Sequence, residues 1–297
     1  ISAAIHAPTS GVVTAVDQRP VPHPSGLPDW CVTIDSDGEE RWIEREPVDY
    51  RRLHPTELRN LLRNAGVVGL GGAAFPSAVK LNLSGHCEHL ETLILNGAEC
   101  EPWITCDDRL MRERAAEIVA GLQVMAHLLE PHEVLIGIED DKPEAIAAMT
   151  AACAGTGYAV RAVPTRYPSG SVKQLVRLLT GKETPVDGLP IDVGVQCFNV
   201  ATAYTVHRAV EYGDPGISRI VTLTGHVNQS RNLEALLGTP FAELVAQCGG
   251  YRDGVERLIM GGPMMGFALH SDEVPVTKAT NCILAAGVAE LAPEQPV

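Results

Sequence analysis

The chain has 297 residues, of which 45% are hydrophobic and 20% are charged, a composition typical of a globular protein with two or three domains. Its formal net charge of -14 disfavours nucleic acid and anionic lipid surfaces as partners, although a local glycine-rich loop can still bind an anionic cofactor. No uninterrupted apolar run of about 18 residues predicts a membrane-spanning helix, and no signal peptide is recognised.

Residues 1–48 are predicted to form a small all-β module. Short apolar runs alternate there with Pro, Gly and Ser, and WCVTIDSDGEERWIE shows period-two alternation around a turn at Asp37 and Gly38. This pattern favours a small barrel or sandwich.

Strands and helices alternate between residues 49 and 215. Helices are expected over residues 55–65, 109–130 and 142–154, and strands over residues 92–95, 133–140 and 158–165. This alternation predicts an α/β layer structure with parallel strands.

Residues 216–270 are predicted to form a compact α+β module. SRIVTLTGHV and RLIMGGPMMGFAL are the expected strands, the second with a glycine turn, and NLEALLGTPFAELVAQCGG contains the expected helix. The remaining residues, 271–297, are expected to be an irregular linker.

The stretch GLGGAAFPSAVKLN, residues 69–82, contains the first candidate binding element. It matches G-x-G-x-x-A, but a helix rather than a full strand precedes it, which weakens a Rossmann interpretation, and the absence of G-K-[ST] excludes a Walker loop. Gly69, Gly71 and Gly72 allow backbone N–H groups to approach a phosphate, and Lys80 lies one turn into the next helix. The alternative is a tight turn beside a solvated lysine.

A second group of candidates follows the expected strand of residues 92–95. Asn96 can donate and accept hydrogen bonds toward a heterocycle, while Glu99 and Glu101 either accept from ribose hydroxyls or form a solvated turn. The stretch CFNVATAY places Asn199 and Thr202 at another loop-to-helix transition, where Thr202 has the alternative of an ordinary core or cap residue.

Several stretches together resemble the RnfC subunit of the Rnf electron-transport complex, namely GLGGAAFPSAVK, LILNGAECEPWITCDDRLMRE, RYPSG, GLPIDVGVQCFNVATAYTVHRAV and PVTKATNCI. The resemblance extends over essentially the whole chain. More distantly, the central region is similar to the flavoprotein subunit of respiratory complex I. The resemblance implies a lipoyl-like barrel-sandwich module over 1–48, a Rossmann-like α/β domain for FMN and NADH over 49–215, a β-grasp soluble-ligand-binding module over 216–270, and a linker over 271–297.

The resemblance also implies contacts for individual residues. In the family the glycine loop and its lysine cradle FMN, and an aromatic residue stacks near the nicotinamide nucleotide. The asparagine and first glutamate after the strand lie at the flavin, the second glutamate faces NADH, and the second loop-to-helix transition holds the FMN phosphate end. Carried over residue by residue, these contacts fall on Gly69, Gly71, Gly72, Lys80, Phe75, Asn96, Glu99, Glu101, Asn199 and Thr202, with Tyr167 and Gly170 on the wall between them.

Three departures from the family pattern bear on these contacts. Ala74 stands where the family usually has glycine, Leu70 where complex I has arginine, and Ser171-Val172 where the family usually carries an acidic residue. NADH affinity is therefore expected to be affected more than FMN affinity.

The cysteines indicate no metal site within these residues. The eight cysteines are scattered without a C-x-x-C pair, so neither a disulfide framework nor zinc or iron–sulfur ligand spacing is predicted. The family continues into two C-x-x-C-x-x-C-x-x-x-C-P motifs, each for a [4Fe–4S] centre, and this sequence has neither. The resemblance thus implies the soluble front part of a longer protein.

The activity implied by the resemblance is electron transfer. It implies a component of a membrane-bound ferredoxin:NAD oxidoreductase, peripheral at the cytoplasmic face of the inner membrane, which uses FMN, NAD(H) and, in the full-length protein, [4Fe–4S] clusters. Other Rnf subunits and ferredoxin would be its partners, and no proton-transferring catalytic residue is required. A docking scaffold with a degenerate site, or a cobalamin reductase of the propanediol-utilisation type, remain as alternatives.

Overall fold

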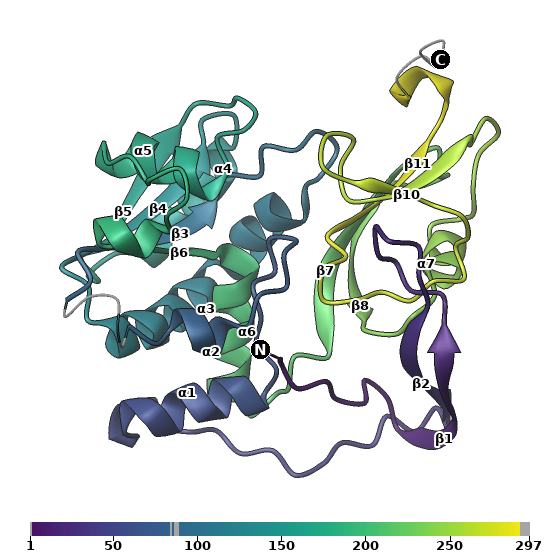
Figure 1. Cartoon of the computed structure of the whole chain (residues 1–297), viewed down its shortest axis with the longest axis horizontal. Coiled ribbons are helices and arrows are strands. Elements are labelled where there is room, and N and C mark those ends of the chain that lie inside the picture. The colour runs from purple at the N-terminus through teal and green to yellow at the C-terminus, as the bar shows by residue number, and fades with distance from the viewer. Residues whose placement is uncertain (1, 84, 86–88, 292–297) are drawn as a thin grey trace. The chain divides into compact units, whose positions relative to one another are not determined.

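The computed structural model describes residues 2–83, 85 and 89–291 (Figure 1). The chain divides into two compact units. The first comprises residues 1–5, 45–100 and 107–216, and the second comprises residues 6–44, 101–106 and 217–297.

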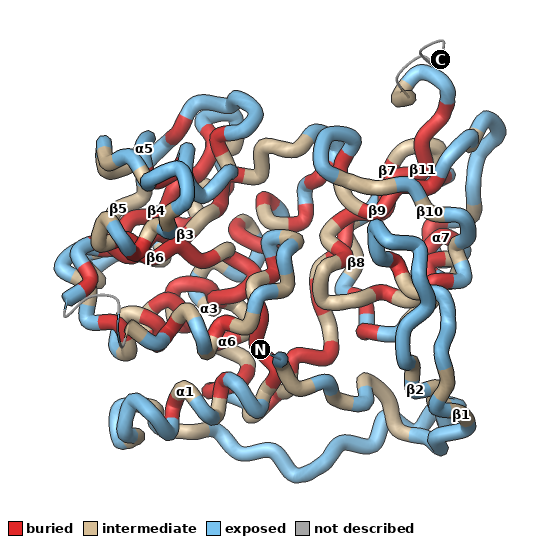
Figure 2. The backbone as a smooth tube through the Cα atoms, viewed as in Figure 1, coloured by how far each residue is buried: buried red, intermediate tan, exposed pale blue. Residues whose placement is uncertain are grey.

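The first unit is built on a parallel sheet with the strand order β5-β4-β3-β6 in the part of the chain that is described. Its strands are β3 (Thr92–Gly97), β4 (Glu133–Glu139), β5 (Ala159–Val163) and β6 (Val195–Asn199). β3, β4 and β6 are almost continuously buried, as expected for parallel strands covered on both faces (Figure 2). The predicted α/β layer structure is confirmed.

Helices cover both faces of this sheet. The helices of the first unit are α1 (Pro55–Asn64), α2 (Ser77–Lys80), α3 (Cys106–Leu129), α4 (Pro143–Ala152), α5 (Val172–Thr180) and α6 (Val200–Glu211), with short 3-10 turns at Tyr50–Arg52 and Pro190–Val193.

Two glycines show how closely these helices pack. A Cβ on Gly137 of β4 would lie 2.8 Å from a methyl group of Leu175, so α5 packs directly on the strand. A Cβ on Gly121 of α3 would lie 1.8 Å from the carbonyl oxygen of Ala203, so only glycine allows α3 and α6 to approach this closely.

The strand order reverses between β3 and β6. The chain proceeds from β3 to β4 and β5 on one side, and then places β6 on the other side of β3. At this reversal Asn96 of β3 lies opposite Asn199 of β6. In open α/β sheets, ligands bind outside the carboxyl ends of the strands at such a point.

The second unit contains two separate sheets. An antiparallel ladder joins β1 (Gly11–Arg19) to β2 (Asp29–Ser36), and β7 (Ser218–Gly225), β8 (Arg231–Leu236), β9 (Arg257–Met260), β10 (Phe267–Leu269) and β11 (Cys282–Ala286) form a sheet in the order β10-β9-β11-β7-β8. Helix α7 (Phe241–Gln247) buries Phe241 and Leu244 in the core of this sheet. A 3-10 turn, Val288–Glu290, follows β11.

The structure departs from the expected elements in several places. The tail from residue 271 is not wholly irregular, because β11 lies inside the sheet between β9 and β7, with all its residues buried. The hairpin partner of β2 is β1, and residues 39–49, directly after the turn at Asp37 and Gly38, form no strand. β8 and α5 form where no separate element was expected.

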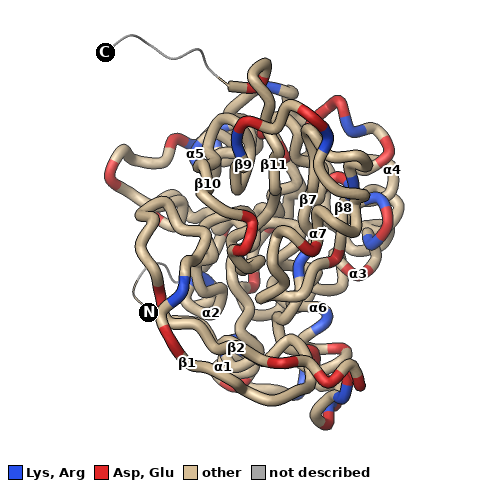
Figure 3. The backbone as a smooth tube through the Cα atoms, turned by 90° about the vertical axis from the view of Figure 1, so that its right-hand side faces the viewer, with Lys and Arg blue, Asp and Glu red and all other residues tan. Residues whose placement is uncertain are grey.

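Charged residues of both signs are distributed along the whole described chain (Figure 3). Acidic residues outnumber basic ones, 37 to 23. Within the described residues, no helix has the length and apolar character required to cross a membrane.

Candidate functional site

The glycine loop is a hairpin that is closed at its base. Gly69 donates its N–H to the carbonyl oxygen of Phe75 at 2.7 Å, and Ser77 donates to the carbonyl oxygen of Val67 at 3.1 Å. An isolated bridge between Val68 and Pro76 lies between these two bonds. The base of the loop is therefore fixed by the backbone, independently of any ligand.

The tip of the hairpin presents unpaired amide groups. None of the N–H groups of residues 71–74 donates a hydrogen bond of normal geometry to a described residue. Gly72 has φ +110°, and a Cβ placed on it would meet no atom within 4 Å, so the backbone here borders open space. Successive amides of this kind form an anion-binding surface.

Ala74 has φ +48°, in the left-handed region that favours glycine. An alanine there costs about 1–2 kcal/mol of strain relative to a right-handed backbone. This strain falls in the turn that carries the free amides.

Thr202 joins this hairpin to helix α6. Its Oγ1 accepts a hydrogen bond from the Leu70 N–H at 2.9 Å and donates to the carbonyl oxygen of Val68 at 3.3 Å. The side chain is completely buried, with 0% exposure. The structure therefore places Thr202 beneath the loop, which agrees with the alternative of a core residue that the sequence left open. The family resemblance implied a contact with the FMN phosphate instead.

Asn199 is the N-cap of α6 and lies beside the hairpin tip. Its Oδ1 accepts from the Ala201 N–H at 2.9 Å, which satisfies one of the unpaired amides of the first turn. A Cβ on Gly71 would lie 3.5 Å from the Asn199 Cβ. The N-terminus of α6 and the tip of the hairpin are thus neighbours.

Asn96 fastens two loops at the end of β3. Its Oδ1 accepts from the Ala98 N–H at 3.0 Å, and its Nδ2 donates to the carbonyl oxygen of Gly170 at 2.9 Å. A Cβ on Gly170 would lie 2.2 Å from the Ala98 carbonyl oxygen, so glycine is required by close packing. Tyr167, three residues earlier, keeps 38% of its surface exposed.

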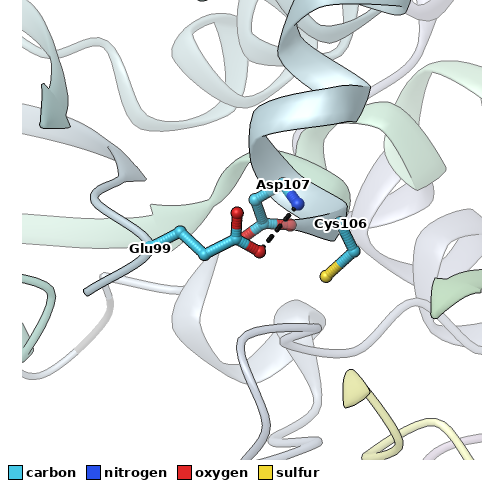
Figure 4. Close-up of side chains that lie close together, drawn as sticks. All are labelled: Glu99, Cys106 and Asp107. Carbon is cyan, nitrogen blue, oxygen red and sulfur yellow. Dashed lines mark hydrogen bonds between the residues drawn. The ribbon is translucent and has the colours of Figure 1, made fainter. Parts of the chain in front are cut away.

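Glu99 caps the start of α3. One carboxylate oxygen accepts from the Asp107 N–H at 2.9 Å (Figure 4). The other accepts from the Asp108 N–H at 3.0 Å. A negative side chain at a helix N-terminus is stabilised by the helix dipole. Glu99 therefore occupies a structural position in the described chain, next to the loop that Asn96 holds.

Lys80 lies against the edge strand β6. Its Nζ donates to the carbonyl oxygen of Cys197 and lies 4.6 Å from the centre of the Phe198 ring. Burial lowers the pKa of Lys80, and burial raises the pKa of the Cys197 thiol to about 11. The lysine thus satisfies an edge-strand carbonyl, whereas the family resemblance implied a contact with FMN and the alternative from the sequence was a solvated side chain.

Glu101 forms hydrogen bonds within the second unit. Its carboxylate accepts from the N–H groups of Met264 at 3.2 Å and Met265 at 2.5 Å, in the turn between β9 and β10. A Cβ on Gly262 would lie 2.3 Å from the same carboxylate. In this structure Glu101 stabilises that turn, a role that the sequence did not suggest.

Glu139 is a candidate that the sequence interpretation missed. It ends β4, at the same edge of the sheet as Asn96, and is 2% exposed. Burial raises the pKa of its carboxyl group. The signal was a polar residue at the carboxyl end of an apolar strand, the same kind of signal that identified Asn96 on β3.

Three family models match the chain. Residues 1–39 match the RnfC barrel sandwich hybrid domain, residues 62–208 the Nuo51 FMN-binding domain, and residues 220–268 the SLBB domain. The middle match contains the glycine hairpin, Asn96, Asn199 and Thr202. The FMN-binding α/β core and its two flanking modules are therefore each recognised separately.

Solved structures support the fold. Two crystal structures of NAD+-reducing [NiFe]-hydrogenase, in the H2-reduced and air-oxidized states, match with a TM-score of 0.63 at 18% and 20% identity. Each match covers 80% of this chain and 47% of the hydrogenase chain. At this identity the likeness establishes the fold alone.

Curated relatives match almost the whole chain. Proteins named as the RnfC-type component of the ion-translocating oxidoreductase complex are 53% identical in Pseudomonas aeruginosa, 51% in Rhodobacter capsulatus and 50% in Serratia proteamaculans, each over 98% of this chain. The chain spans 38%, 56% and 42% of these relatives, respectively. Over the part of those proteins that it spans, the chain belongs to the RnfC family of ion-translocating oxidoreductase complexes.

Proposed function

We propose that this chain binds FMN at the carboxyl edge of its parallel sheet, with the phosphate on the free amides of residues 71–74. The observation that carries the proposal is the position of these amides beside the N-terminus of α6, where the strand order reverses. A helix N-terminus and a glycine loop together favour a phosphate dianion through N–H donors and the helix dipole.

The groups around the hairpin tip fit the chemistry of FMN. Open space at Gly72 allows close approach of a ligand, and the free amides match phosphate oxygens in kind. Phe75, at the base of the hairpin, is 41% exposed, and Tyr167, near the loop that Asn96 holds, is 38% exposed, which leaves apolar surface for a flat ring system. When bound, FMN supplies hydride exchange with NAD(H) and single-electron exchange with iron–sulfur clusters.

The chain's own contribution is binding and orientation. Asn96 holds the loops at residues 98 and 170 in place, Asn199 caps α6, and Glu99 fixes the start of α3. In the proposed complex Asn96 would give up one of its two hydrogen bonds to these loops and form a hydrogen bond to the flavin instead. No side chain is assigned a proton transfer.

We further propose that the protein works as an electron-transfer component of a membrane-bound ferredoxin:NAD oxidoreductase. The names of the relatives, as components of ion-translocating oxidoreductase complexes, support this role. Ferredoxin, NAD(H) and other subunits of the complex would be the partners, at the cytoplasmic face of the membrane, and [4Fe–4S] clusters would be the one-electron acceptors in the full-length protein.

A docking scaffold is the second candidate, and one group of contacts favours it. Lys80, Glu101 and Thr202, all assigned to the ligand by family resemblance, are engaged by the protein itself in this structure. A scaffold would bind neither flavin nor nicotinamide nucleotide with physiological affinity. Flavin binding separates the two functions.

The test is a titration of the flavin-free chain with FMN and with riboflavin, followed by flavin fluorescence in a phosphate-free buffer. Saturable binding of FMN, at least about tenfold tighter than riboflavin, is expected from one or more charged hydrogen bonds to the phosphate. No saturable binding of either flavin would reject the FMN site and favour the scaffold.

A further inference from the structure

We propose that Thr202 is a positioning residue that sets the glycine hairpin against the N-terminus of α6 and thereby determines selectivity for a phosphorylated flavin. This inference rests on the proposed FMN site. It assigns to Thr202 no contact with the ligand, because its side chain is wholly buried.

The Thr202 hydroxyl uses both of its hydrogen-bonding functions on the hairpin. It accepts from Leu70 at 2.9 Å and donates to Val68 at 3.3 Å. Val68 and Leu70 are themselves 3% and 6% exposed, so water cannot readily replace the hydroxyl. Loss of the hydroxyl removes this partner from the buried Leu70 N–H and Val68 carbonyl groups. The hairpin strand then either shifts to find other partners or the folded state becomes less stable.

Thr202 also lies in the element that supplies the second group of N–H donors, the N-terminus of α6. It lies in the first turn of α6, three residues after the N-cap Asn199. The residues it holds, Val68 and Leu70, lead directly into the free amides of residues 71–74. One side chain therefore joins the two groups of N–H donors that would meet at a phosphate.

The spacing of these two groups matters because hydrogen bonds are short. N–H donors must lie about 2.7–3.2 Å from a phosphate oxygen, and a displacement of about 1 Å removes most of the interaction. Contacts of the flavin ring with exposed apolar faces tolerate such a displacement better, since they are not directional. Loss of the hydroxyl should therefore weaken FMN binding more than riboflavin binding.

Three variants of the whole chain test this inference. Thr202→Val keeps the side-chain shape and removes the hydroxyl, whereas Thr202→Ser keeps the hydroxyl. The matched control is Thr205→Val in the same helix, because the Thr205 hydroxyl donates to the Ala201 carbonyl oxygen at 3.0 Å and not to the hairpin. Dissociation constants for FMN and riboflavin are measured for each variant, and exchange of the Leu70 amide hydrogen is measured without ligand.

The expected result is a fall of about tenfold in the FMN-to-riboflavin preference of Thr202→Val, with Thr202→Ser and Thr205→Val close to wild type. Exchange at Leu70 should become faster in Thr202→Val alone. An unchanged preference in Thr202→Val, or an equal loss in Thr205→Val, would overturn the inference.

Failure of the FMN site gives a different result, because the wild-type chain would then show no preference for FMN. Amide exchange at Leu70 still tests the hydrogen bond in that case. If Thr202→Val does not fold, the positioning role of Thr202 is tested by Leu70 amide exchange and FMN preference in the wild type and in Thr202→Ser. Slow exchange at Leu70 in both, with FMN preference kept in Thr202→Ser, supports the positioning role, and fast exchange in the wild type contradicts it.

Discussion

Asn199 donates from Nδ2 to the carboxylate of Asp107 at 2.5 Å, although the two residues are 92 positions apart in the sequence. The same asparagine caps α6 through its Oδ1, and the Asp107 N–H is bound by Glu99. The N-termini of α3 and α6 are therefore joined at the edge of the sheet where Asn96 and Asn199 lie opposite each other.

Replacement of Asn199 separates its capping role from its contact with Asp107. Asn199→Ala should lower the free energy of unfolding by about 1–2 kcal/mol, because both the cap and a charged hydrogen bond are lost. Asn199→Ser retains a capping oxygen and should lose about half as much. Urea unfolding monitored by circular dichroism measures both, and equal losses would show that the cap contributes nothing.

Lys80 gives the first unit a pH-dependent stability. Burial lowers its pKa in the folded protein below the ordinary value of 10.5, so the unfolded state binds more protons between the folded and unfolded pKa values. Stability contributed by this residue is therefore fully present above the unfolded pKa and is lost as the pH falls through the folded pKa.

Lys80→Met should remove this dependence. The difference in unfolding free energy, wild type minus variant, is expected to increase as the pH is raised from about 7 toward about 10. Urea unfolding of both proteins at several pH values measures it. A difference that stays constant over this range would show that the ammonium group is not buried in solution.

Glu101 is expected to act on the second unit and not on flavin affinity. Glu101→Ala removes the acceptor for the Met264 and Met265 N–H groups, at a cost of about 1.5–3 kcal/mol for bonds to a charged group. Faster amide exchange at those two methionines is the direct readout, with Glu99→Ala as the control. A weaker FMN affinity with unchanged exchange would instead support the ligand contact that family resemblance assigned to Glu101.

Ala74 offers a substitution that should improve stability. Ala74→Gly relieves strain at φ +48°, about 1–2 kcal/mol, against about 0.4–1 kcal/mol of added entropy in the unfolded chain. A net gain of up to about 1.6 kcal/mol is expected. The control, Ala147→Gly at an exposed position within α4, should lose about 1 kcal/mol. Equal losses in the two variants would contradict the left-handed conformation.

The elements that the sequence predicted are those with strong local patterns. The expected helix 109–130 and the expected strands 92–95 and 133–140 have apolar patterns that can be recognised from local sequence. The position of Asn199 at the start of a helix could also be predicted, because it lies between an apolar strand and a helical pattern. β11 was missed because CILAA is a short apolar run without period-two alternation. Its partners, β7 and β9, are identified only by tertiary pairing.

Side-chain assignments within the candidate site were less predictable for the same reason. Family resemblance assigned Thr202, Lys80 and Glu101 to the ligand, and in this structure each meets a backbone group more than 100 positions away in the sequence. Local sequence does not encode such pairings. Exposed backbone at Gly71 and Gly72, by contrast, could be anticipated from the glycines themselves, because glycine content determines the conformations open to the backbone, whereas the N–H of Gly69 is bonded to Phe75.

The most direct test of the account is the effect of FMN on the backbone amide resonances of the isotope-labelled chain. Addition of FMN should shift the N–H signals of residues 71–74 and of the first turn of α6, and riboflavin, which lacks the phosphate, should shift them much less. Identical shifts with both flavins, or FMN-induced shifts that leave residues 71–74 unmoved, would contradict a phosphate site on the glycine hairpin.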